Sequence, residues 1–262
     1  MSARPDLRAL PGGGAGRAQD LLGSAIGTAS AWLVEPAAPA PQSFRTTPAL
    51  SRPVIAVFGL ARGCGVTVVA RALAAELARR DSTGAAAVHC DARAAGIPLA
   101  TPAAGQLARA LSQLPGTDTR AVGRLCLVGG AEWTALSQTT RELAPLVLDA
   151  GSVTLGGAPA ALADRVLLVA TPAVEPALGG VAVGCLARLG HAPLLVLNRA
   201  GPSAGELDAE EPEDRHGGWL ARGVHLLPES RMGAQLASGG RETRGELGRA
   251  MGELADLCEL GA

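Results

Sequence analysis

One stretch, residues 53–80, constrains the fold of this 262-residue chain more than any other. It opens with an apolar run rich in β-branched residues, 54–58, which predicts a short buried strand. The loop that follows contains Gly59, Gly63 and Gly65. Apolar residues then recur at helical spacing, at Val69, Leu73 and Leu77. A strand, a glycine loop and a helix in this order form a phosphate cradle, because the loop N–H groups and the positive end of the helix dipole converge on an anion.

The stretch resembles the P-loop of the MinD/ParA family, the deviant Walker A ATPases that position septa, plasmids, chemoreceptors and pilus machines. Aligned on the threonine, the family pattern Lys-Gly-Gly-x-Gly-Lys-Thr falls on residues 61–67, which read Ala-Arg-Gly-Cys-Gly-Val-Thr. Ala61 stands at the signature lysine and Val66 at the P-loop lysine. The resemblance implies that the nucleotide-binding residues of this loop are Arg62, Gly63, Cys64, Gly65, Val66 and Thr67.

The chain contains no lysine, because all 23 of its Lys and Arg residues are arginine. No other alignment can therefore supply a P-loop lysine. A charge-assisted contact to phosphate contributes roughly 1.5–3 kcal/mol to binding, and more where charge develops during phosphoryl transfer. We expect weakened nucleotide binding and impaired hydrolysis, since the planar fork of Arg62 does not reproduce an ammonium. High-GC coding would also explain the missing lysines, with the same chemical consequence.

The resemblance places two further elements of the hydrolytic site. Residues 85–91 predict a second parallel strand that ends at Asp91, where relatives carry Asp-x-Asp, and Arg93 stands at the aspartate that positions the attacking water. His89 of this strand is expected to be a packed histidine and not a ligand. Residues 145–149 predict a strand ending in Asp149, which resembles the Walker B and switch II acid. Asp149 is the one catalytic candidate and, with Thr67, would hold magnesium if that ion is bound.

The adenine side of the resemblance lies later in the chain. A strand at 163–172 ends in Thr-Pro, as in relatives, and a strand at 194–198 ends in Asn198 followed by Arg199. In relatives this Asn-basic pair reads the adenine, for which an amide suits because it both donates and accepts. The alternative is a turn or capping asparagine. A last strand at 223–227 leads to Pro228, which resembles the turn that lies over the base.

Alternation of these strands with helices over 106–114 and 132–143, and a strand at 124–128, predicts an α/β fold. We expect a doubly wound, mostly parallel central sheet with helices on both faces. Residues 1–51 are expected to be an N-terminal tail with a candidate short helix and a Pro/Ala linker, and 52–262 the P-loop domain. The final helix, 246–260, is expected to pack on the core. Its apolar face has Leu247, Met251, Leu254, Leu257 and Cys258.

Composition excludes several classes of function. The net charge of −1, with two Phe, three Trp and no Tyr, predicts no specific nucleic-acid binding. Five cysteines lack metal-ligand spacing and indicate a reducing compartment. Cys64 would stand at a helix N-terminus, where a thiolate is favoured, so a redox role is an alternative there. No apolar run is long enough to span a membrane, which predicts a cytoplasmic protein, peripheral at most at the inner face of the membrane.

We expect a degenerate MinD/ParA-like pseudo-ATPase of the TadZ/CpaE or septum-site-determining kind. It would act as a localisation or assembly factor for a pilus, secretion or division machine, as a homodimer with a protein partner. ATP or ADP, with magnesium, would be its weakened ligands. One alternative is a slow but active ATPase that uses Arg62 and the loop amides. Another is a nucleotide-free structural subunit.

Overall fold

The computed structural model describes residues 52–89, 101–102, 105–129, 133–151, 157–172, 176–200 and 223–259. The expectations for the N-terminal tail 1–51, for Asp91 and for Arg93 lie outside these residues. All the elements below belong to the unit that contains the P-loop.

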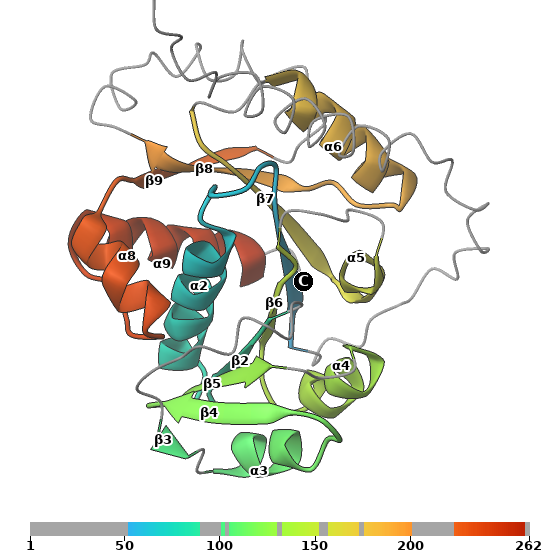
Figure 1. The fold of residues 1–262 in the computed structure, drawn as a ribbon, viewed down its shortest axis with the longest axis vertical. Coiled ribbons are helices and arrows are strands. Elements are labelled where there is room, and N and C mark those ends of the chain that lie inside the picture. Colours follow the sequence, from blue (N-terminus) through green and yellow to red (C-terminus); the bar gives the residue numbers. More distant parts are fainter. Residues whose placement is uncertain are drawn as a thin grey trace, which may run out of the picture. The chain divides into compact units, whose positions relative to one another are not determined.

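The described strands form one nine-stranded sheet in the order β3-β4-β5-β2-β6-β1-β7-β8-β9 (Figure 1). Its strands are β1 Val54–Gly59, β2 Ala85–His89, β3 Thr101–Pro102, β4 Asp118–Val122, β5 Leu125–Gly129, β6 Leu146–Asp149, β7 Arg165–Ala170, β8 Leu194–Ala200 and β9 Val224–Pro228. From β5 to β9 every neighbouring pair is parallel, whereas β3–β4 and β4–β5 are antiparallel. A mostly parallel central sheet is thus confirmed.

Helices cover both faces of this sheet, as the alternating pattern predicts. They are α2 Val66–Arg80, α3 Gln106–Ser112, α4 Trp133–Arg141, α5 Ala158–Leu162, α6 Pro176–Arg188, α8 Arg231–Ser238 and α9 Gly245–Glu259. Helix α2 packs against α8 and α9 on one face, and α4 contacts both α3 and α5 on the other. Figure 1 shows α6 on the same side as α5. The doubly wound arrangement is therefore confirmed, and none of the described helices is long and apolar enough to cross a membrane.

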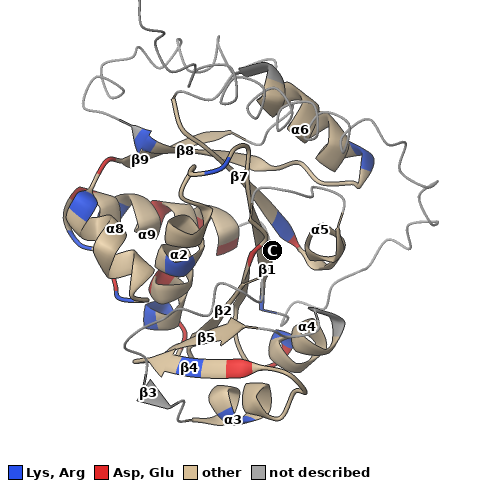
Figure 2. Cartoon of the chain, viewed as in Figure 1, with Lys and Arg blue, Asp and Glu red and all other residues tan. Residues whose placement is uncertain are grey.

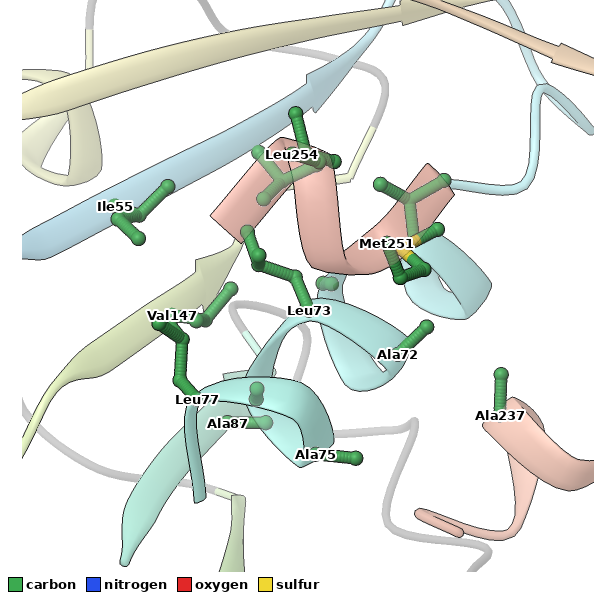
Figure 3. Packing of buried hydrophobic residues seen from close by; sticks show 14 of the residues in the cluster. Ile55, Ala72, Leu73, Ala75, Leu77, Ala87, Val147, Ala237, Met251 and Leu254 are labelled. Atoms are coloured by element: carbon green, nitrogen blue, oxygen red, sulfur yellow. The ribbon is translucent and has the colours of Figure 1, made fainter. Parts of the chain in front are cut away.

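The core on the α2 face joins the strand and helix of the glycine stretch. The side chains of Ile55, Leu73 and Leu77 are fully buried, which confirms the expected apolar faces. Figure 3 shows Leu73 and Leu77 among side chains of β6 and α9, including Val147. Burial of one such side chain contributes about 1.5–3 kcal/mol. This packing fixes the direction in which α2 leaves the glycine loop.

Helix α9 packs on the core, but not with every residue that its sequence pattern indicates. Leu254 is buried, whereas Leu257 is 49% exposed, so its assignment to the buried face was wrong. The acidic side of α9 meets Arg80 of α2, whose guanidinium donates to Glu259 Oε2 at 3.0 Å and to Asp256 Oδ1. The acids of α9 therefore have a structural partner within the chain.

The sequence pattern did not indicate strand β4. Its side chains Asp118 and Arg120 are exposed, and β4 turns back into β5 through Gly123, whose φ is +59°. A polar strand beside the edge of the sheet has only a weak apolar alternation, and periodicity does not identify it. Figure 2 shows a basic and an acidic segment of β4 next to each other. Charges of both signs are also interspersed over the other described elements.

Candidate functional site

The glycine loop lies where the order of the sheet reverses. Strand β1 sits between β6 and β7, with β2 beyond β6 and β8 beyond β7. In open α/β sheets a ligand crevice forms at the carboxyl ends of strands at such a point. The loop after β1 leads directly into α2 at Val66. The sequence prediction that this turn joins a central strand to a helix is confirmed.

The loop backbone is held from both sides. Gly59 N donates to Gly151 O at 2.8 Å and Leu60 N donates to Val169 O at 2.9 Å, so the ends of β6 and β7 both hold it. Gly63 and Gly65 have φ of +81° and +88°, a region that favours glycine. The first-turn N–H groups of α2 have no partner within the helix. This backbone has the features that an anion site uses.

The side chains of the loop do not add the missing ammonium. Val66, at the lysine position, is 8% exposed, and its Cγ2 lies where a Cβ on Gly59 would overlap it. Ala61 is half-buried, and Arg62 and Gly63 are exposed. An apolar side chain thus fills the space beside Gly59, and Arg62 is the cation within the loop itself.

Cys64 does not have the environment of a reactive thiolate. Its side chain is buried, and this burial is the largest influence on the thiol and raises its pKa. Hydrogen bonds with the backbone of Ala61, Thr171 and Leu60 act in the opposite direction without reversing the shift. The prediction of a favoured thiolate at Cys64 was therefore wrong, because desolvation outweighs these hydrogen bonds and the charge of Arg199.

Asn198 joins the end of β8 to the glycine loop. Its Nδ2 donates to Cys64 O at 2.8 Å, and its Oδ1 accepts from Arg199 N at 3.0 Å. Arg199 has a φ of +60°, unusual for a residue with a side chain, at an irregularity in the β8–β9 pairing. Asn198 thus has a bracing role that sequence reasoning did not assign to it.

A cavity of about 190 Å³ lies beside this brace. It is lined by Gly65, Val68, Val69, Asn198, Arg199, Pro228, Glu229, Ser230, Arg231, Ala234, Leu247 and Met251. The structure therefore brings together four residues that the sequence placed at the nucleotide. The cavity is smaller than the roughly 300–1,000 Å³ typical of pockets for whole ligands, so its size suits one part of a ligand, such as a base.

Asp149 and Thr67 meet on the other side of the loop, within a buried polar network that the sequence did not reveal. Asp149 is 3% exposed. His89 Nδ1 lies 2.9 Å from Asp149 Oδ2, and Arg71 Nη2 lies 2.8 Å from His89 Nε2. Arg71 Nη1 also donates to Ser238 O. The sequence has an arginine on the P-loop helix and a histidine two residues before Asp91. Sequence alone does not show that either of them lies near Asp149.

Asp149 is ionised despite its burial. Desolvation alone would raise its pKa, but hydrogen bonds from His89, Thr67 and the Gly151 amide, with the charge interaction with His89, lower it overall. Burial lowers the pKa of Arg71, and the negative charge of Asp149 opposes that shift. The buried carboxylate and the buried guanidinium therefore stabilise each other's charged forms.

A magnesium ion at Thr67 and Asp149 would compete with a neighbouring side chain of the same chain. Thr67 and Asp149 offer the oxygen ligands that magnesium prefers, but one oxygen of the buried carboxylate already faces the imidazole of His89. Among the residues that the structure describes, no cluster of three or more His, Cys, Asp or Glu side chains could hold a metal. The sequence expectation of a magnesium site at Thr67 and Asp149 therefore has an internal competitor in His89.

Gly65→Ala should lower the free energy of unfolding by about 1–3 kcal/mol more than Gly63→Ala. Both substitutions put a side chain into the left-handed region, at a cost of about 1–2 kcal/mol each. A Cβ on Gly65 would also overlap Asn198 Nδ2, whereas nothing lies within 4 Å of one on Gly63. Urea unfolding of both variants isolates the contribution of the brace. Equal losses would mean that Asn198 does not hold the loop.

No protein-family model matches the sequence, and no curated protein sequence matches it. Solved structures do match. The MinD cell division protein of Aquifex aeolicus is 16% identical with a TM-score of 0.58, over 78% of this chain and 95% of that one. The same organism's MinC:MinD complex gives 0.55 at 15% identity, over 78% and 95%.

Two further structures show the same likeness. A ParA family ATPase from Chlorobium tepidum TLS is 14% identical with a TM-score of 0.53, over 78% of this chain and 98% of that one. The ATP complex of a McdA variant from Cyanothece is 14% identical with a TM-score of 0.54, over 79% and 96%. Identities of this size establish a fold and not an activity. This chain therefore has the fold of the MinD and ParA ATPases.

Proposed function

We propose that this chain binds an adenine nucleotide at the glycine loop without turning it over efficiently, and that it acts as a localisation or assembly factor. The observation that carries the proposal is the combination of a retained loop backbone with Val66 at the lysine position. The fold, which resembles that of an ATP-bound McdA, supports a nucleotide as the ligand.

The proposed ligand would lie across the two sides of the loop. Its phosphates would face the N–H groups of residues 62–67, at the positive end of α2. Its base would lie in the cavity between Gly65, Asn198 and Pro228. Arg199 and Arg62, both exposed, supply positive charge on the two sides of this path. The affinity is expected to be weak, because neither arginine occupies the position of the lysine.

Slow turnover follows from the residues that phosphoryl transfer lacks. Val66 and Ala61 replace the two lysines, and Arg93 replaces the aspartate at the attacking water in the family pattern. Developing charge on the transferred phosphoryl group would have no ammonium to stabilise it. Binding can persist under these conditions, because backbone amides contribute to it without taking part in chemistry.

We further propose that the chain works as a homodimer with a protein partner in a pilus, secretion or division machine, in the manner of TadZ/CpaE or septum-site-determining proteins. MinD, whose fold it shares, forms a complex with MinC. A protein that binds nucleotide without hydrolysing it would act through the proteins with which it assembles. The proposed location is the cytoplasm, with peripheral membrane association at most.

A titration with a fluorescent ATP analogue and with ADP, followed by a phosphate-release assay, tests the proposal. Saturable binding with little phosphate release is expected. Saturable hydrolysis by the unsubstituted protein would establish a slow ATPase instead. Absence of binding to either nucleotide would establish the nucleotide-free structural subunit.

Val66→Lys should tighten ATP binding about tenfold or more, because a charge-assisted contact to phosphate is worth roughly 1.5–3 kcal/mol. Val66→Met is the matched control, since it lengthens the side chain without adding charge. It should leave the affinity within about threefold of the parent value. The fluorescence titration measures both variants. Equal affinities for the two would show that the loop does not face phosphate.

A further inference from the structure

The network around Asp149 arises from the register of two neighbouring strands. His89 at the end of β2 pairs with Asp149 at the end of β6 in the parallel ladder. Their side chains meet at 2.9 Å between Nδ1 and Oδ2. Arg71, one helical turn into α2, reaches the opposite nitrogen of the same ring at 2.8 Å. The imidazole is therefore held between a guanidinium and a carboxylate.

This arrangement determines which nitrogen of His89 carries the proton. A guanidinium has five N–H donors and no acceptor, so Nε2 of His89 must accept from Arg71 Nη2. The ring proton then lies on Nδ1, the nitrogen that is 2.9 Å from Asp149 Oδ2. Arg71 is itself fixed, because it is 6% exposed and its Nη1 donates to Ser238 O of α8. Arg71 thus positions His89, and His89 positions Asp149.

The charges of this network balance without any added ion. The guanidinium of Arg71 contributes one positive charge and the carboxylate of Asp149 contributes one negative charge, and the two favour each other's ionised forms. A divalent cation at Asp149 Oδ2 would have to displace the imidazole ring of His89, whose Nδ1 lies 2.9 Å away, and would share a buried region with the Arg71 guanidinium. Like charges in such a region of low dielectric repel strongly. Asp149 is therefore already neutralised from within the chain.

We propose that Arg71 and His89 take the place of a magnesium ion at Asp149, so that the nucleotide binds without a metal requirement. This inference rests on the proposed nucleotide binding. Arg71 and His89 are positioning residues in this scheme, since neither is required to touch the nucleotide. The chain would accept free ATP or ADP as readily as the magnesium complex.

The test compares ATP affinity in magnesium buffer and in EDTA, with the full chain and a fluorescent ATP analogue. The unsubstituted protein should bind equally in the two buffers, within about twofold. Arg71→Leu combined with His89→Leu removes the guanidinium, the donor and the ring, and should make binding about tenfold tighter with magnesium than in EDTA. His89→Asn is the matched control, because its amide N–H can still face Asp149, and it should keep the equal affinities.

The outcomes separate this inference from the proposed function. Loss of binding by the unsubstituted protein in EDTA, about tenfold or more, would overturn the inference and leave nucleotide binding intact. Absence of binding in both buffers would overturn the proposed function and, with it, the metal-free binding. The His89 tautomer is an independent readout by long-range proton–nitrogen NMR of the ligand-free protein. A proton on Nε2 would overturn the inference, even if the double variant fails to fold.

Discussion

Asp149→Ala should lower the free energy of unfolding by about 3–5 kcal/mol, since removing the buried carboxylate leaves the nearby buried charge of Arg71 uncompensated. Arg71 would keep its guanidinium in the interior with only the Ser238 carbonyl and the His89 ring as partners. The Nδ1–H of His89 would lose its acceptor as well. Urea unfolding monitored by circular dichroism measures the change.

A triple variant provides the control for this expectation. Arg71→Leu, His89→Leu and Asp149→Leu together remove both charges and both donors at once. Replacing a complete buried ionic group by apolar residues is often neutral or stabilising by about 1–4 kcal/mol. The triple variant should therefore be more stable than Asp149→Ala alone. If the single variant loses less than about 1 kcal/mol, the network does not couple these charges.

Leu254→Ala should lower the free energy of unfolding by about 2–5 kcal/mol, because it removes a fully buried side chain from the core beneath α9. Figure 3 shows Leu254 within the cluster that contains Leu73 of α2. The lost contacts and the cavity left behind both add to the cost. Chemical denaturation with a check that the m-value is unchanged measures the effect.

Leu257→Ala is the matched control on the same helix. Its side chain is 49% exposed, and surface substitutions usually change stability within about 0.5 kcal/mol. A loss at Leu257 equal to that at Leu254 would mean that α9 packs with a different face. A helix that served as a detachable membrane anchor would give little loss at either position.

Some of this structure could be predicted from sequence because the evidence was local. The strand, loop and helix of residues 53–80 carry their own periodicity and glycines, and the structure has them as β1 and α2. The alternation of the remaining segments predicted the parallel sheet for the same reason. Local pattern could not identify β4, whose exposed Asp118 and Arg120 interrupt the apolar signal.

Predicting the polar network requires knowing which strands are neighbours in the sheet, and no local sequence pattern contains that information. Arg71 and His89 lie 18 residues apart along the chain, and Asp149 belongs to a third element. Their meeting depends on which strand pairs with β2, and that neighbour is β6 and not the next strand in sequence. The same holds for Asn198, 134 residues from the Cys64 carbonyl that it binds. For helix α9 the sequence prediction was less precise, because helical spacing alone did not distinguish the buried Leu254 from the half-exposed Leu257.

The hydrogen bond from Asn198 to the Cys64 carbonyl has a mechanical consequence. The carboxamide ties the tip of β8 to the turn that begins α2, so neither can shift without pulling on the other. Strand β9 is the outermost of the described strands on that side and pairs with β8. A protein that docks along this margin and displaces β8 would therefore also move the glycine turn, through this amide and through β7, whose Val169 carbonyl accepts from Leu60 N.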